Sequence, residues 1–188
     1  MKVKEATKKE IEDRINIMGD YVKIEYLSNC LKNALDYDTR KFVLVKLAGL
    51  FESKGMLWDA GKTMRAAAEI NTTSQNKIMD YVKAAELFIR AGNFDELDLV
   101  EKRAFGIANE RQREEIKNKL KEVCKLWAKH YLKTDKRKNA MIMYEKLMTL
   151  ELNEAERIDA VDNLLNLYSS LGKIREYNRL KGMNKNKE

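Results

Sequence analysis

Proline is missing from this chain of 188 residues, and glycine occurs only 8 times. Proline breaks the interior of a helix and glycine weakens it, so the scarcity of both favours helices along the whole chain. Long β-branched runs with the period-two alternation typical of strands are also missing. The expected fold class is therefore all-α, without a sheet.

Cysteine and histidine are equally scarce. Cys30 and Cys124 are far apart in sequence and fall on expected buried helix faces, so both are predicted to be core residues rather than a disulfide or a metal site. The one histidine, His130, cannot make a metal site alone, and a hydrolytic triad would need a nucleophile poised against it. Glycine-rich phosphate loops, G-x-S-x-G and H-E-x-x-H are absent. The sequence thus predicts no metal, no cofactor and no enzymatic activity.

Long apolar runs are missing as well. None approaches the roughly 20 residues that a membrane helix needs, and the first residues lack the apolar core and cleavage site of a secretory signal. We therefore expect a cytoplasmic protein with no membrane insertion. The apolar fraction of 44% and charged fraction of 36% are those of a globular protein that is more charged than average.

Apolar residues recur at helical spacing from the N-terminus onward. They predict a single helical-repeat domain over 1–181, built from hairpins at about 2–37, 40–70, 75–105, 113–149 and 154–181. Asp38 or Thr39 is the expected N-cap of the third helix, and Asp135 that of the eighth. Residues 182–188 have little to bury and are expected to be disordered.

A repeat emerges when the chain is aligned at its predicted turns, which are Gly55, Gly92, Asp135 and Gly172. Successive turns are 37, 43 and 37 residues apart, a spacing typical of stacked helical hairpins. An aromatic residue stands four positions before each turn: Phe51, Phe88, Tyr131 and Tyr168. A small or aliphatic residue stands seven positions before it: Ala48, Ala85, Ala128 and Leu165. The position five after the turn is held by Ala60, Leu97, Ala140 and Tyr177.

These columns resemble the tetratricopeptide repeat, in a divergent form, over about Arg40 to Lys181. In that pattern a small residue lets two helices approach closely, and a large residue one turn later fills the gap beside it. The first-column tryptophan and the terminal proline of the family are missing here, and the repeats are longer. The resemblance implies a right-handed α-α superhelix, a TPR-like solenoid of about five helical hairpins.

The resemblance also implies that the first helix of each hairpin lines a concave face that binds a partner. The corresponding positions are Phe42, Val45, Met79, Val82, Glu86, Ile89, Glu122, Lys125, Lys129 and Leu132. Phe42 to Ile89 would form an apolar floor and the two lysines a basic wall, which suits an amphipathic helix or an extended peptide with an acidic end. The alternative is that Phe42, Val45, Met79 and Val82 are core residues covered by neighbouring helices. The lysines and asparagine with which some relatives clamp a terminal carboxylate are absent.

Basic residues concentrate between Arg111 and Lys146, a segment that contains 12 Lys and Arg but 5 Asp and Glu. We call the following set the basic ridge: Lys117, Lys121, Lys125, Lys129, Lys133, Lys136, Arg137 and Lys138. Such a ridge can attract phosphate backbones or an acidic protein, or it can be a solvated helix face.

The leading hypothesis is therefore a non-enzymatic scaffold or adaptor whose concave face binds a peptide or helix of another protein. The alternative is a protein associated with RNA or DNA through the basic ridge. Self-association stays open, with the C-terminal edge near Leu167, Leu171 and Leu180 as the expected contact.

Overall fold

The computed structural model describes residues 3–185, and within this range the chain forms α-helices and no strand. The predicted all-α class is confirmed. The helices are α1 (Lys8–Asn16), α2 (Asp20–Cys30), α3 (Tyr37–Ser53), α4 (Leu57–Ile70), α5 (Ser74–Ala91), α6 (Phe94–Ile107), α7 (Glu110–Lys133), α8 (Arg137–Leu147), α9 (Glu154–Ser170) and α10 (Ile174–Lys185).

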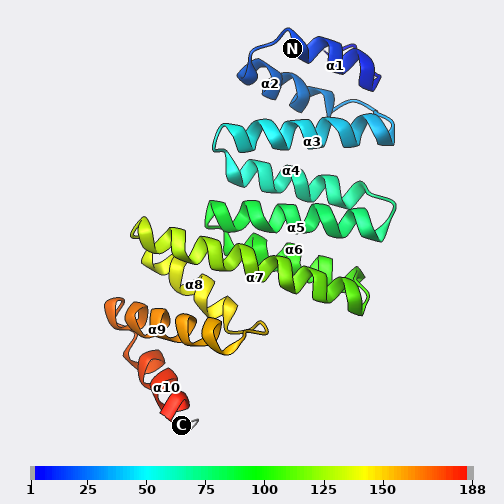
Figure 1. Ribbon diagram of the computed structural model, residues 1–188. Coiled ribbons are helices and arrows are strands. Elements are labelled where there is room, and N and C mark those ends of the chain that lie inside the picture. The colour runs from blue at the N-terminus through cyan, green and yellow to red at the C-terminus, as the bar shows by residue number, and fades with distance from the viewer. Residues whose placement is uncertain (1–2, 186–188) are drawn as a thin grey trace. The chain divides into compact units, whose positions relative to one another are not determined.

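The chain divides into two compact units, Met1–Arg113 and Glu114–Glu188. In the first unit, helices α2 to α5 each lie beside the next (Figure 1), α6 packs on α5, and α1 packs on α3. In the second unit, α9 packs against both α8 and α10. The single domain predicted over 1–181 stays a prediction.

Several helix ends differ from the prediction. The N-cap of α3 is Asp36, whose carboxylate accepts the Thr39 N–H at 3.0 Å, so Asp38 and Thr39 lie inside the helix. Asp135 does not cap α8, because the N-cap residue there is Lys136. Helix α10 continues through Lys185, beyond the expected start of disorder at residue 182, and 186–188 lie outside the described residues.

The four aligned turns have the same backbone conformation. Their central residues all have positive φ: 73° at Gly55, 71° at Gly92, 54° at Asp135 and 68° at Gly172. The next residue donates its N–H to the carbonyl of the aromatic residue five positions back, as in Met56 to Phe51 (2.9 Å), Asn93 to Phe88 (3.0 Å), Lys136 to Tyr131 (2.8 Å) and Lys173 to Tyr168 (2.8 Å). This is the six-to-one bond of the Schellman motif, which needs a left-handed residue. The predicted repeat is thus present as a repeated turn.

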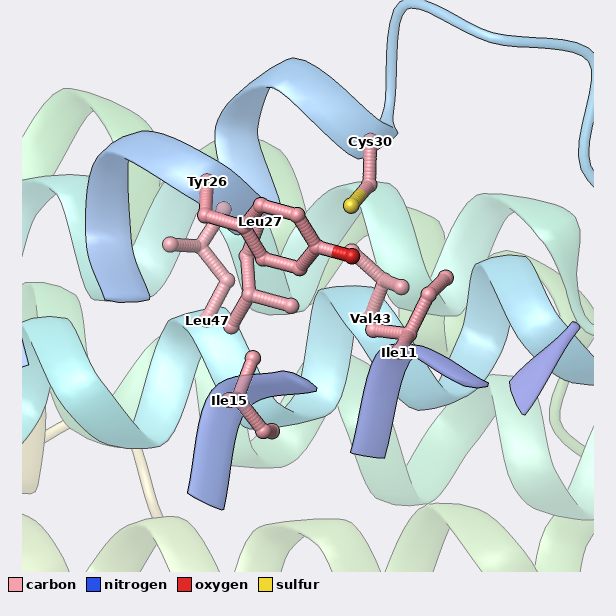
Figure 2. Close-up of a cluster of buried hydrophobic side chains, with 7 residues drawn as sticks. All are labelled: Ile11, Ile15, Tyr26, Leu27, Cys30, Val43 and Leu47. Carbon is pink, nitrogen blue, oxygen red and sulfur yellow. The ribbon is translucent and has the colours of Figure 1, made fainter. Parts of the chain in front are cut away.

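The N-terminal helices complete the core of the first unit. Ile11 and Ile15 of α1 and Tyr26, Leu27 and Cys30 of α2 meet Val43 and Leu47 of α3, as Figure 2 shows. Burial raises the pKa of the Cys30 thiol, which keeps it protonated and unreactive. Both Cys30 and Cys124 are buried, as predicted.

Polar side chains tie alternate helices of the first unit together. Lys41 of α3 forms an ion pair with Asp80 of α5 and donates to the Ala67 carbonyl of α4 at 3.2 Å. The buried Asn71 amide donates to Asp80 at 2.7 Å and accepts from the Tyr37 hydroxyl at 3.1 Å. Buried polar groups need hydrogen-bond partners. This network supplies them for the Asn71 side chain and the Ala67 carbonyl at the C-terminal end of α4.

The small residues of the repeat are core residues. Ala48, Ala85 and Ala128, at the position seven before the turn, are all buried. A close approach between helices occurs at Gly61 of α4, where an added Cβ would lie 2.6 Å from Cε1 of the fully buried Phe88 ring of α5. The ring has no free space to move into, because protein cores are close-packed.

We expect Gly61→Ala to destabilise the protein by about 1–3 kcal/mol, because the new methyl group overpacks the α4–α5 contact. The matched control is Gly49→Ala in α3, where an added Cβ meets no atom within 4 Å. That control should stabilise the protein by about 0.5–1 kcal/mol, since alanine is the better helix former. Urea denaturation followed by circular dichroism measures both, and equal effects of the two variants would contradict the close approach.

Candidate functional site

A pocket of about 230 Å³ opens on the second unit. We call it the α7–α9 pocket; it is lined by Lys125, Lys129, Tyr144, Leu147, Leu152, Ala155, Glu156, Asp159 and Ala160. Its charged residues come from α7 and α9, and its apolar residues from α8, α9 and the loop between them. The site therefore combines an apolar interior with four charged groups.

The capping box of α9 positions one wall of the pocket. Asn153 accepts the Glu156 N–H at 2.9 Å, and the Glu156 carboxylate accepts the Asn153 N–H at 3.1 Å. The other carboxylate oxygen of Glu156 accepts from Lys125 of α7 at 2.8 Å. One carboxylate thus starts α9 and joins it to α7.

These contacts change the acid–base properties of the wall. The hydrogen bond from Lys125 and that from the Asn153 backbone lower the pKa of Glu156 to about 2. The same pairing with Glu156, together with Glu122 at 3.1 Å, raises the pKa of Lys125. Lys125 and Glu156 therefore neutralise each other at neutral pH.

The two other charged residues of the pocket are available to a ligand. In the part of the chain that the structure describes, neither Lys129 nor Asp159 forms an ion pair. Both are exposed, and the Asp159 carboxylate accepts only the Asn163 amide, at 3.2 Å. The pocket presents one free cation and one free anion and has no net charge.

Tyr144 contributes a buried hydroxyl without a partner. The side chain is 2% exposed, and its Oη has no hydrogen bond among the described residues. Burial, and to a smaller extent the negative charge of Asp159, raise the pKa of Tyr144 to about 12, so the hydroxyl keeps its proton. A buried hydroxyl without a partner costs free energy.

The predicted partner-facing residues of the first unit differ in how exposed their side chains are. Val45 and Met79 are 43% and 54% exposed, so they are not core residues. Phe42, Val82 and Glu86 are half-buried, and Phe42 packs against the N-terminal core. The prediction that Ile89 faces a partner is wrong, because its side chain is fully buried.

Charged residues bridge α3 and α5 in the first unit. Glu52 forms ion pairs with Arg90 and, at 3.4 Å, with Lys83. Glu86 is bound by Lys83 at 3.4 Å and by Arg90 at 3.6 Å. Glu86 is thus already engaged in a network that joins the two helices.

The basic ridge is partly neutralised. Lys117 forms an ion pair with Glu114 at 2.5 Å, and Lys121 contacts Glu156 at 3.6 Å and the Glu151 carbonyl at 3.2 Å. Arg137 pairs with Asp135 at 2.7 Å, and Lys136 lies over the Tyr131 ring at 5.9 Å. Lys133 and Lys138 are exposed and form no ion pair within the described range.

The C-terminal edge has a second hollow, of about 260 Å³, between α8, α9 and α10. Its apolar lining includes Leu164, Leu180 and Met183. Of the leucines expected at a self-association contact, Leu167 is buried, whereas Leu171 and Leu180 are half-buried. Leu167 is therefore a core residue, and self-association stays a prediction.

Lys125 and Lys129 are the lining residues of the pocket that the sequence predicts as site residues, and the other lining residues are not predicted from the sequence. Tyr144 is the one lining residue whose type could have indicated a site. The repeat places a buried apolar residue at this position, and a tyrosine there has a hydroxyl that needs a hydrogen-bond partner. Ala155 and Asp159 carried no such signal.

The described helices offer neither a metal-binding cluster nor a membrane-spanning segment. No group of three or more His, Cys, Asp or Glu side chains in the described range could hold a metal ion. Among the helices described, none has the length and apolar character needed to cross a membrane.

Comparisons with known proteins show limited similarity. No family model and no curated protein sequence matches the chain. Among solved structures, it is similar to BtubC (BKLC) from P. vanneervenii, with 17% sequence identity and a TM-score of 0.41. The match covers 95% of this chain and 78% of that one. Similarity at this level does not establish a common function.

We expect Glu156→Gln to lower the free energy of unfolding at neutral pH. The folded-state pKa of Glu156 is about 2, below its ordinary value of 4.5, so the stabilisation is complete above that value and disappears as the pH falls to about 2. The difference between wild type and variant, measured by urea denaturation, should shrink over this range. Glu154→Gln, on the same helical turn, is the control; a difference independent of pH would contradict the assignment.

Proposed function

We propose that this chain is a TPR-like α-α superhelix of about five hairpins that serves as a non-enzymatic scaffold or adaptor. It binds a segment of another protein, and the α7–α9 pocket is its contact site. The repeated left-handed turn supports the architecture, because stacked hairpins reuse one supersecondary unit. The cytoplasmic location expected from the sequence is part of the same proposal.

One observation carries this proposal. Lys125 and Lys129, which the repeat resemblance assigns to partner contacts, line an open pocket with an apolar interior. At about 230 Å³ the pocket is smaller than the roughly 300–1,000 Å³ usual for small-molecule and cofactor sites. It has room for one large side chain, which is how partner anchors are held at protein interfaces.

The test uses peptides selected on the immobilised full-length chain from a random phage-displayed library. The Ala155→Trp variant places an indole in the pocket from an exposed position of α9, so the core is undisturbed. We expect it to weaken binding of the selected peptides at least about 10-fold in fluorescence polarisation, because the anchor is excluded.

The matched control is Ile158→Trp, an exposed position of the same helix outside the pocket lining. It should leave peptide affinity within about 2-fold of wild type. Equal affinities for wild type and Ala155→Trp, or failure to select any peptide, would contradict the proposed function.

A second candidate is binding of a nucleic-acid backbone by the end of the basic ridge. An open hollow of about 480 Å³ lies beside Lys136, Arg137 and Lys138 in the second unit. With Lys133 and Lys138 unpaired, cationic side chains there are free to replace the counterions of a phosphate backbone.

For this candidate, we expect a labelled single-stranded RNA of about 20 nucleotides to bind with an affinity that falls steeply between about 50 and 200 mM salt. Binding should be abolished in the triple variant Lys133→Glu, Lys136→Glu and Lys138→Glu. The control variant changes three exposed lysines of the first unit to Glu and so alters the net charge by the same amount. These lysines are Lys9, Lys32 and Lys102. Absence of binding at low salt, or equal loss in the control, would exclude the candidate.

A further inference from the structure

We infer that the hollow between α8, α9 and α10 takes a lysine or arginine side chain of a partner protein, whose charged group pairs with Glu145. We call this feature the C-terminal hollow. It shares no lining residue with the α7–α9 pocket, so it is a second contact site on the same unit. The inference rests on the proposed function in one respect, because both require the chain to bind a segment of another protein.

The half-buried carboxylate of Glu145 lines the C-terminal hollow and has no cation. One of its oxygens accepts the hydroxyl of the buried Tyr168 at 2.9 Å, and this contact between α8 and α9 fixes the position of the carboxylate. The other oxygen makes no hydrogen bond in the described part of the chain and is not closed off from solvent. Glu145 also forms no ion pair there. A partly desolvated carboxylate of this kind is stabilised by an opposite charge, which a ligand can supply.

Negative charge is in excess around the C-terminal hollow. Two carboxylates line it, those of Glu145 and Glu176, against one guanidinium, that of Arg179. Arg179 is exposed and pairs with neither of them in the described range; Glu176 contacts Lys173 instead, at 3.6 Å. Burial raises the pKa of Tyr168, and the charges of Glu145 and Glu176 raise it further, against a smaller opposite effect of Arg179. A cation is therefore favoured in the hollow, and a carboxylate is repelled.

The rest of the lining suits the stem of a long basic side chain. It is apolar and consists of Met148, Leu164, Leu180 and Met183, together with the Tyr168 ring. Lysine and arginine lay their methylene groups along apolar surface while the charged group reaches a polar partner. At about 260 Å³ the hollow is smaller than most small-molecule sites, and it has room for one such side chain. A purely apolar anchor would fill the hollow but leave Glu145 without a cation.

The overall charge of the chain makes this inference specific. Its formal net charge is +7, so a basic peptide is repelled by the protein as a whole. Capture of a basic side chain therefore depends on a local carboxylate and not on general attraction.

The experiment uses a random phage-displayed peptide library that is first depleted on the full-length Met183→Trp variant and then selected on the wild-type chain. Met183 is an exposed lining residue of α10, so the indole fills the hollow without disturbing the core. We expect Met183→Trp to weaken the retained peptides at least about 10-fold in fluorescence polarisation. The matched control is Ile174→Trp, at an exposed position of α10 outside the lining, which should leave affinity within about 2-fold.

A double-mutant cycle then identifies the paired groups. Each retained peptide is synthesised with its lysine or arginine and with norleucine in that place, which keeps the stem and removes the charge. On wild type we expect this replacement to weaken binding about 10-fold, because a charge-assisted contact is lost. On Glu145→Gln it should cost at most about 3-fold, since the amide oxygen still accepts the Tyr168 hydroxyl but has no charge. Glu154→Gln, at an exposed position of α9 outside the lining, should keep the full 10-fold effect.

A second variant tests the same electrostatics without touching a buried group. Arg179 is exposed, so Arg179→Gln leaves the core intact and removes the one cation of the lining. It should strengthen binding of the basic peptides about 3-fold, because a like charge is removed from the hollow. Weaker binding would show that Arg179 itself contacts the peptide, and this would overturn the inference.

The outcomes separate this inference from the proposed function. Retained peptides with a basic residue coupled to Glu145 support the inference. Failure to retain any peptide after depletion, anchors without a positive charge, or a basic residue uncoupled from Glu145 would each overturn it. None of these three results affects the test with Ala155→Trp, which concerns the α7–α9 pocket alone.

Discussion

The helical arrangement depends on one backbone hydrogen bond, which recurs four times. After each left-handed residue, an N–H bonds to the carbonyl of an aromatic residue five positions back. The bond ends one helix and turns the chain toward the next. The side chain of that aromatic residue is buried at Phe88, Tyr131 and Tyr168, so the group that closes the turn also fills the adjoining core. Reversal and packing are therefore coupled in one residue.

Asp135 is the exception among the turn residues, and it shows how strong this constraint is. The left-handed region costs most side chains roughly 1–2 kcal/mol, and only glycine enters it freely. Aspartate is among the few residues that tolerate it, because its short polar side chain can bond locally. Here the carboxylate accepts from Arg137 at 2.7 Å. The turn is kept although its glycine is missing, because the six-to-one bond requires that conformation.

In the candidate site, too, one group has two structural roles. Glu156 caps the start of α9 and holds Lys125 of α7, so one carboxylate joins helix initiation to the wall of the pocket. Neutralising these two charges leaves Lys129 and Asp159 as the charged groups of the pocket that are open to a ligand. The specificity of such a pocket comes from groups that folding leaves unsatisfied, because satisfied groups have little to gain from a partner.

The sequence by itself determined the helical class, the four turn positions and the buried cysteines, because these follow from local rules. Proline content, glycine at a helix end and the period of apolar residues act within a few neighbouring residues. Tertiary structure alone decided that Ile89 is buried while Met79 of the same helix is exposed, and that Tyr144 faces a pocket. It also decided that Asp36 starts α3, although Asp38 and Thr39 are equally good caps. Each of these outcomes depends on which surfaces neighbouring helices cover, and the pattern within one helix does not contain that information.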